Sequence, residues 1–238
     1  MTVFDDLLQV QEHDTAADRL RHRRQNLPEL AELGEVEDAL AALEAALLDV
    51  RGRAAEAARA ERRLDGELGL VEAKVAELDA KLYSGAITVP RELQAMQAEG
   101  EALRARRAEL EDQVLEAMGE REPLDGEVEA LTRRREAFDA DGARLRVAVA
   151  EAQAGIDQEL GEELAARALV AETVAPDLAA LYEQLRARLG GVAAAPLVNG
   201  RCGGCHLALP ATEIARLRHE PPETLVRCEQ CERILVRH

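Results

Sequence analysis

The sequence predicts a mainly α fold, in which a long antiparallel coiled-coil hairpin carries a small C-terminal β domain. Composition is the first observation: aromatic residues make up 2% of the 238 residues, charged residues make up 32%, and Ala, Leu, Glu and Arg dominate. Such a composition is typical of long helices and too poor in aromatic anchors for a compact core of this length. The other two observations are a pair of apolar heptad patterns and a group of four cysteines near the C-terminus.

The first arm of the predicted hairpin follows an apolar pattern from Leu33 to Leu82. Its apolar residues are separated by alternating steps of three and four, and only Glu61 interrupts them. A pattern of this kind over about seven heptads forms the buried seam of a coiled coil. Upstream, Leu27-Pro28 predicts a kink or break near the base of the arm, because proline disfavours helical backbone in the residue before it.

A tight connection at residues 83–90 separates the two arms. Gly85 and Pro90 interrupt the helical pattern, and Pro90 suits the first turn of a new helix. A second apolar pattern then runs from Leu93 to Leu145, with more polar interruptions that include Arg121. Pro123 lies inside this pattern and predicts a bend near mid-length.

One register of the two arms satisfies both seams without an insertion. It pairs Leu82 with Leu93, Leu78 with Met96, Leu64 with Leu110 and Val36 with Phe138, and it places Glu61 opposite Val114. The competing interpretation is a parallel dimer of each segment. The short connection favours the intramolecular hairpin, so we predict a hairpin over residues 1–172 with its tip at residues 83–90.

Shorter elements are predicted after residue 172. Residues 173–191 are expected to form a connecting helix that packs on the base of the hairpin, with Pro176 near its start and Gly190-Gly191 at its end. Residues 192–238 are expected to form the β domain. Its predicted elements are strands at 192–198, 206–209, 225–227 and 234–236, a turn at Asn199-Gly200 and a short helix at 212–219.

Two C-x-x-C motifs, Cys202 with Cys205 and Cys228 with Cys231, carry the chemistry of the chain. Two intervening residues let both sulfurs of a motif face one metal, and four thiolates with no vacant position form a closed, structural zinc site. We therefore predict a C4 zinc ribbon at 192–238 that binds one Zn²⁺. Two disulfides, a redox motif and an iron–sulfur cluster are the alternatives. His206 is interpreted as a strand residue or a hydrogen-bond donor to the site.

The charge of the chain limits its partners. A net charge of −17 argues against a general hold on nucleic acid, which requires phosphate neutralisation by Lys and Arg. A local basic cluster is nevertheless present, formed by Arg19, Arg21, Arg23 and Arg24. No apolar stretch is long enough to cross a membrane, and clustered cysteines suit a reducing compartment, so we predict a cytoplasmic protein that does not contact membranes.

Two segments resemble the bacterial C4-type zinc ribbon family of coiled-coil proteins. One is the predicted tip, Leu82-Tyr83-Ser84-Gly85-Ala86-Ile87-Thr88 with Pro90, Glu92, Leu93 and Gln97. The other runs from Pro196 to Pro210 and is completed by Val226-Arg227-Cys228 and by Cys231 to Leu235. The resemblance implies a helical hairpin with a terminal zinc ribbon, and it implies that Cys202, Cys205, Cys228 and Cys231 bind the metal.

These observations predict a zinc-binding adaptor that is not an enzyme. The sequence contains no Gly-rich phosphate loop and no recognisable catalytic group of residues. Tyr83, Ile87 and Val89 at the tip are apolar or aromatic and are predicted to bind a protein partner, or alternatively to pack the turn itself. The alternative function is a regulator of gene expression that binds RNA or DNA through the ribbon and through Arg19, Arg21, Arg23 and Arg24. The oligomeric state is predicted to be a monomer or a weak dimer.

Overall fold

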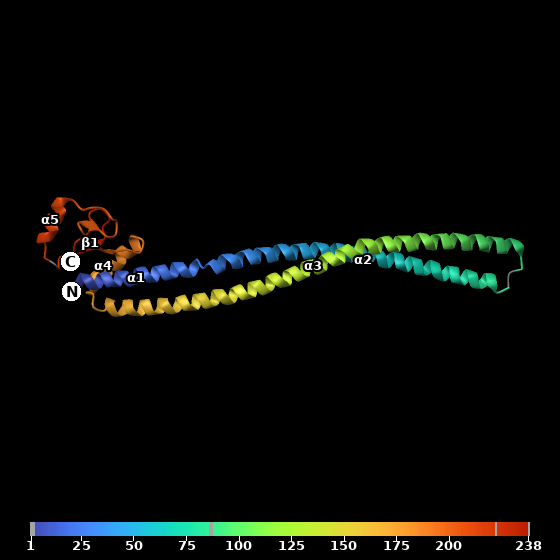
Figure 1. The fold of residues 1–238 in the computed structure, drawn as a ribbon, viewed down its shortest axis with the longest axis horizontal. Helices are drawn as coiled ribbons and strands as arrows, with labels where there is room; N and C mark the ends of the chain where they lie inside the picture. Colours follow the sequence, from blue (N-terminus) through green and yellow to red (C-terminus); the bar gives the residue numbers. More distant parts are fainter. Residues whose placement is uncertain (1–2, 86–87, 222, 238) are drawn as a thin grey trace. The chain divides into compact units, whose positions relative to one another are not determined.

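The chain forms two compact units. A computed structural model describes residues 3–85, 88–221 and 223–237. Unit 1 contains residues 1–32 and 145–238, and unit 2 contains residues 33–144. Two long helices, α2 (Pro28–Tyr83) and α3 (Pro90–Ala171), contribute residues to both units, and Figure 1 follows them along the chain.

Unit 2 is an antiparallel hairpin of α2 and α3 (Figure 1). The residues of α2 that are buried all belong to the predicted seam, namely Leu43, Leu47, Val50, Ala54, Val75 and Leu78. On α3 the seam residues Gly100, Leu110 and Ala117 are buried in turn. The predicted hairpin is therefore confirmed. The helix α3 continues through Pro123, and the bend expected there stays a prediction.

Contacts between the two arms fall both close to the predicted register, as for Arg106 with Glu67 at 3.8 Å, and about one helical turn from it. A Cβ atom on Gly100 would lie 3.1 Å from Cδ2 of Leu78, the residue that was predicted to pair with Met96. Glu61 was predicted to lie opposite Val114. In the structure its carboxylate accepts a hydrogen bond of 2.7 Å from Arg121. Each seam residue of a coiled coil contacts residues on adjoining turns of the facing helix, so the apolar pattern alone does not fix which residues pair. In the structure Glu61 and Arg121, which interrupt the two seams, pair with each other.

The ends of the long helices lie at the predicted breakers. Helix α1 (Val3–Gln25) ends just before Leu27, and α2 begins at Pro28, which confirms the break. The side-chain amide of Asn26 donates to the carbonyl of His22 at 2.7 Å and so satisfies one terminal group of α1. At the tip, α2 ends at Tyr83, Gly85 adopts a φ of 72°, and α3 begins at Pro90.

In unit 1 the helix α4 (Pro176–Arg188) packs against α1, as the sequence predicts. The shared core contains Phe4, Leu7 and Val10 of α1, Tyr182 and Leu185 of α4, and Val174, Ala193, Ala194, Ile234 and Val236. Gly190 and Gly191 have φ values of 72° and 97°, which end α4 and turn the chain toward the sheet. The connecting helix therefore joins the base of the hairpin to the β domain through one apolar core.

Two buried polar residues of α1 reinforce this packing. The side-chain oxygen of Gln11 accepts hydrogen bonds from the backbone N–H groups of Ala193, at 2.7 Å, and Ala194, at 3.2 Å. The carboxylate of Asp14 accepts a hydrogen bond of 2.8 Å from the hydroxyl of Tyr182. Arg167 and Arg186 also lie within 4 Å of this carboxylate, at 3.2 Å and 3.4 Å. We call Asp14, Arg167, Tyr182 and Arg186 the Asp14 cluster.

The sheet of the β domain has the strand order β2-β1-β3. Strand β1 (Ala194–Val198) pairs antiparallel with β2 (Arg201–Cys202) and parallel with β3 (Ile234–Val236). Between β1 and β2, Asn199 and Gly200 have φ values of 51° and 72°, the conformation of a two-residue hairpin turn. The helix α5 (Ala211–His219) follows, so the predicted turn and short helix are both confirmed.

Two of the predicted strands are wrong. Residues 206–209 and 225–227 form only isolated bridges, between Arg201 and Ala208 and between Arg227 and Ile234. Their apolar pattern indicated strands, but each segment adjoins a cysteine turn whose own hydrogen bonds use the backbone. The same bonds build the metal centre.

Candidate metal centre

The two C-x-x-C motifs adopt the same backbone structure. In the first knuckle (residues 201–208), the N–H of His206 donates to the carbonyl of Cys202, and the N–H of Cys202 donates to that of Leu207, at 2.8 Å and 3.1 Å. In the second knuckle (residues 227–234), Glu232 N–H donates to Cys228, and Cys228 N–H donates to Arg233, at 2.8 Å and 2.9 Å. Both knuckles therefore close with an identical pair of hydrogen bonds and direct their two sulfurs to one side.

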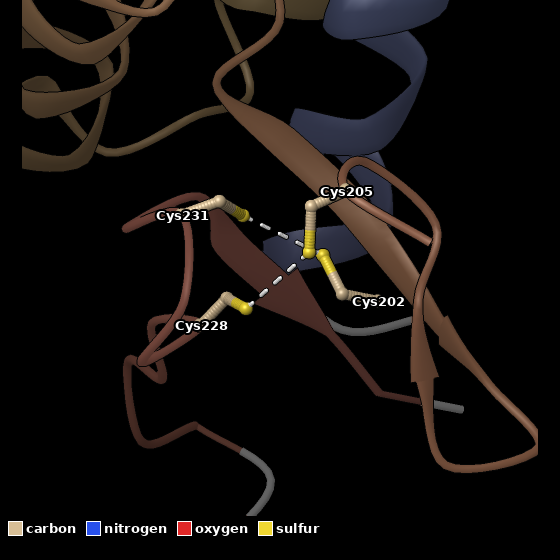
Figure 2. Close-up of side chains that lie close together, drawn as sticks. All are labelled: Cys202, Cys205, Cys228 and Cys231. Carbon is tan, nitrogen blue, oxygen red and sulfur yellow. Dashed lines mark hydrogen bonds between the residues drawn. The ribbon is translucent and has the colours of Figure 1, made fainter. Parts of the chain in front are cut away.

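The four sulfurs converge on a common centre (Figure 2). A tetrahedral zinc with Zn–S bonds of about 2.3 Å holds its sulfurs about 3.8 Å apart. The sulfurs of Cys202 and Cys231 are 3.8 Å apart, those of Cys205 and Cys228 are 3.9 Å apart, and all four lie within 4.8 Å of one another. All four thiols are free, which contradicts the alternative of two disulfides. The arrangement fits one tetrahedral zinc ion.

Burial and the knuckle backbone oppose each other in setting the thiol pKa values. Burial raises the pKa of Cys202 and brings that of Cys228 to about 12, although backbone N–H groups within each knuckle donate to the sulfurs and act in the opposite direction. Burial is the largest single effect on Cys231 and acts to raise its pKa. Several hydrogen bonds to its sulfur, chiefly from the backbone and side chain of Arg233, together outweigh burial and lower the pKa to about 7. In the absence of metal, Cys202 and Cys228 therefore favour the protonated thiol, and only Cys231 is shifted toward the thiolate, the form that binds zinc.

The glycines of the first knuckle are required by close packing. A Cβ atom on Gly203 would lie 3.0 Å from the carbonyl oxygen of Pro196, and one on Gly204 would lie 2.4 Å from Cδ of Arg233. The second contact places the aliphatic part of Arg233 directly against the first knuckle. The sequence pattern gave no indication of this role for Arg233.

His206 is not the strand residue that the sequence suggested. Its φ is 62°, and Glu232 has the same φ at the equivalent position of the second knuckle. Each residue follows the second cysteine of its motif and supplies the N–H that closes the turn. The imidazole of His206 is not part of the sulfur cluster, which contains the four cysteines alone among the described residues.

The other predicted sites lie on the surface. Tyr83 is 86% exposed and Val89 is 48% exposed, while Ile87 lies outside the described residues. In the basic cluster, three arginines have carboxylates nearby: Arg21 bonds Asp18 at 2.7 Å, Arg23 lies 3.8 Å from Glu159, and Arg24 bonds Asp157 at 2.7 Å. Arg19 is exposed and has no ion-pair partner in the described part of the chain. Two of the four arginines, Arg23 and Arg24, therefore pair α1 with α3, whereas Arg21 pairs within α1.

None of the described helices is long and apolar enough to span a membrane. Unit 1 also contains a surface groove beside the β domain, lined by Leu8, Gln11, Glu12, Thr15, Arg19, Val192, Ala194, Ala195, Pro196 and Gly203. Gln11 is already bonded to the backbone there, and Glu12 and Arg19 are the ionisable residues among those that line the groove.

Comparisons with known proteins agree with the geometry. Residues 10–190 match the CT398-like coiled coil hairpin domain, and residues 201–235 match the C4-type zinc ribbon domain. An uncharacterised protein of Mycobacterium tuberculosis is 33% identical, over 97% of this chain and 94% of its own length. Together with the convergent sulfurs, the ribbon match identifies one structural zinc as the cofactor.

Solved structures show the same architecture. A protein from Mycobacterium smegmatis is similar with a TM-score of 0.75 and 31% identity, covering 98% of this chain and 97% of that one. CT398 from Chlamydia trachomatis has a TM-score of 0.73 and 21% identity, covering 99% of this chain and 98% of its own, and so supports the fold alone. The chain belongs to the CT398-like family of coiled-coil hairpin proteins with a C-terminal C4-type zinc ribbon.

Proposed function

We propose that this protein is a non-enzymatic, cytoplasmic adaptor in which Cys202, Cys205, Cys228 and Cys231 bind one structural zinc. Its two compact units each present a surface for a different macromolecular partner. The exposed aromatic side chain at the tip is the observation that carries this proposal. Tyr83 is 86% exposed at the end of α2. An aromatic ring that packs against nothing adds no stability to the hairpin itself.

The tip suits protein recognition for a physical reason. Tyr83 and Val89 lie at the two ends of the connection between α2 and α3, and both side chains are exposed. A partner that covered them would remove their apolar surface from water, which favours binding. Tyrosine is also enriched among the residues that dominate binding energy at interfaces. The tip surface consists of Tyr83, Val89 and, as a prediction from sequence, Ile87.

The ribbon offers the second surface. Val198, beside the hairpin turn, is 52% exposed, and Leu207, in the first knuckle, is 53% exposed. Strand pairing with Arg201 fixes the backbone of Val198, and the closed first knuckle fixes that of Leu207, so their side chains are held ready for contact without a large ordering cost. We call Val198 and Leu207 the ribbon surface.

Paired variants test the adaptor role. The tip variant combines Tyr83→Ala with Val89→Asp, and the ribbon variant combines Val198→Asp with Leu207→Asp. Leu70→Asp is the matched control, because Leu70 is 68% exposed on α2 away from the tip. Quantitative affinity purification after in-cell crosslinking should show one set of proteins depleted by the tip variant, another by the ribbon variant, and neither by the control. An unchanged set in both variants would refute the proposal.

Nucleic acid is the alternative partner, and the same samples address it. Nuclease treatment before elution and a salt titration of RNA and DNA binding separate it from a protein partner, since phosphate contacts weaken steeply with salt. Arg19→Ala is the informative variant, because the neighbouring arginines already pair with carboxylates. Strong binding at low salt that Arg19→Ala weakens would favour the regulator of gene expression over the protein adaptor.

A further inference from the structure

Arg233 connects the metal centre to the segment that links α4 with the sheet. Its Nε donates to the carbonyl of Val192 at 2.9 Å, and its Nη2 lies 3.4 Å from the carbonyl of Leu189. Leu189 is the C-cap residue that follows α4, and Val192 precedes β1. The aliphatic part of the same side chain rests on Gly204, in the first knuckle. One half-buried side chain thus contacts the first knuckle and the linking segment from its position in the second knuckle.

Glu232 adds a second connection at the same place. Its carboxylate bonds to Arg188 near the end of α4, and Arg227 lies 3.4 Å from the same oxygen. Glu232 and Arg233 directly follow Cys231, so their positions depend on how the second knuckle closes. The N–H of Glu232 closes that knuckle through its bond of 2.8 Å to the carbonyl of Cys228.

We propose that Arg233 is a positioning residue through which zinc binding controls the docking of the ribbon on α4 and on the base of the hairpin. With the four thiolates held by one metal, the second knuckle is closed and Arg233 lies across the linking segment. Without the metal the two knuckles are no longer tied together. Arg233 then loses its support on Gly204, and the carbonyls of Leu189 and Val192 lose their charged donor.

The linking segment provides its own reporters. The N–H groups of Leu189 and Gly191 donate to the carbonyls of Leu185 and Arg186, and those of Ala193 and Ala194 donate to Gln11. All four amides should exchange slowly with deuterium while the ribbon is docked. Loss of docking opens this segment locally and speeds exchange without unfolding the long helices.

Arg237 offers a matched control. It also lies next to β3 and donates to backbone carbonyls, at 2.6 Å to Leu217 and 2.8 Å to Pro221, but these belong to α5 and the loop after it. Replacing Arg237 should therefore affect the ribbon without touching the linking segment. Arg233→Lys keeps the charge and loses the forked geometry, so it should fall between wild type and Arg233→Gln.

The experiment is hydrogen–deuterium exchange by mass spectrometry on the full-length zinc-loaded chain and on the same chain after chelation. Measured in excess zinc, so that each chain holds one ion, Arg233→Gln should exchange about tenfold faster at residues 189–194, the effect of losing a charged hydrogen bond. Chelation of the wild type should speed exchange in the same segment, and Arg237→Gln should speed it only at residues 211–224. Wild-type protection at 189–194 in zinc-loaded Arg233→Gln, or unchanged protection of the wild type after chelation, would overturn the proposal.

Discussion

Replacing Asp14 by alanine removes a buried carboxylate on which three side chains of unit 1 converge. The carboxylate is only 6% exposed, and it contacts the Tyr182 hydroxyl at 2.8 Å, Arg167 at 3.2 Å and Arg186 at 3.4 Å. The substitution leaves the Tyr182 hydroxyl buried without its acceptor. It also leaves two partly buried guanidinium groups with one carboxylate fewer.

The expected cost follows from what remains after the change. Removing one partner from a buried ion pair costs about 3–5 kcal/mol, because an uncompensated charge stays buried. Arg167 keeps its contact with Glu183, and Arg186 keeps its bond to Asp18, so the lower end applies. We expect Asp14→Ala to reduce the free energy of unfolding of unit 1 by about 3 kcal/mol.

Tyrosine fluorescence can report this change specifically. The chain has two tyrosines and no tryptophan, so a Tyr83→Phe background leaves Tyr182 as the reporter of unit 1 in urea unfolding. The control is Asp18→Ala, one turn further along α1, whose carboxylate is 42% exposed and should contribute less than about 1 kcal/mol. An Asp14→Ala loss as small as that of the control would refute the assignment of Asp14 as a buried organising charge.

Three further outcomes are expected. Leu78→Cys combined with Gly100→Cys should crosslink faster on mild oxidation than Leu78→Cys combined with Met96→Cys, as peptide mass spectrometry would show, because Gly100 lies against the Leu78 side chain; the reverse order would favour the pairing of Leu78 with Met96. Gly200→Ala should destabilise the ribbon by about 1–3 kcal/mol in thermal unfolding, because its φ is 72° and the new Cβ would lie 2.7 Å from Ile214. The control Asn199→Gly should leave the stability of the ribbon unchanged or raise it, because glycine adopts a positive φ without strain. Zinc affinity, measured with a zinc-sensitive dye, should fall as pH falls, since protons compete for thiols such as Cys228, whose pKa burial raises to about 12; a constant affinity from mildly alkaline to mildly acidic buffer would contradict four-thiolate ligation.

Periodicity predicted the hairpin well but left its register ambiguous. Every buried residue of α2 belongs to the seam that the sequence defines, since a heptad pattern states which face of a helix is apolar. It does not state which turn of one helix meets which turn of the other. That choice depends on pair contacts, such as Glu61 with Arg121, that no property of either arm alone encodes.

The metal centre was equally accessible from the sequence, and its surroundings were not. Cysteine spacing is a local signal that survives any arrangement of the rest of the chain, so the four converging sulfurs were predicted correctly. The residues that attach the ribbon to the hairpin base carry no local signal. Gln11 and Ala193 are 182 positions apart, and a glutamine in a charged helix looks like any solvent-facing residue until the fold buries it.

The two knuckles share one backbone structure but carry different side chains at matching positions. At matching positions the second knuckle has Glu232 and Arg233, and the first has His206 and Leu207. Glu232 and Arg233 contact the end of α4, so they attach the ribbon to unit 1. Leu207 occupies the equivalent place with half of its surface exposed. Because a single zinc would hold both knuckles in register, we expect the rigidity that attaches the ribbon on one side to support the proposed ribbon surface on the other.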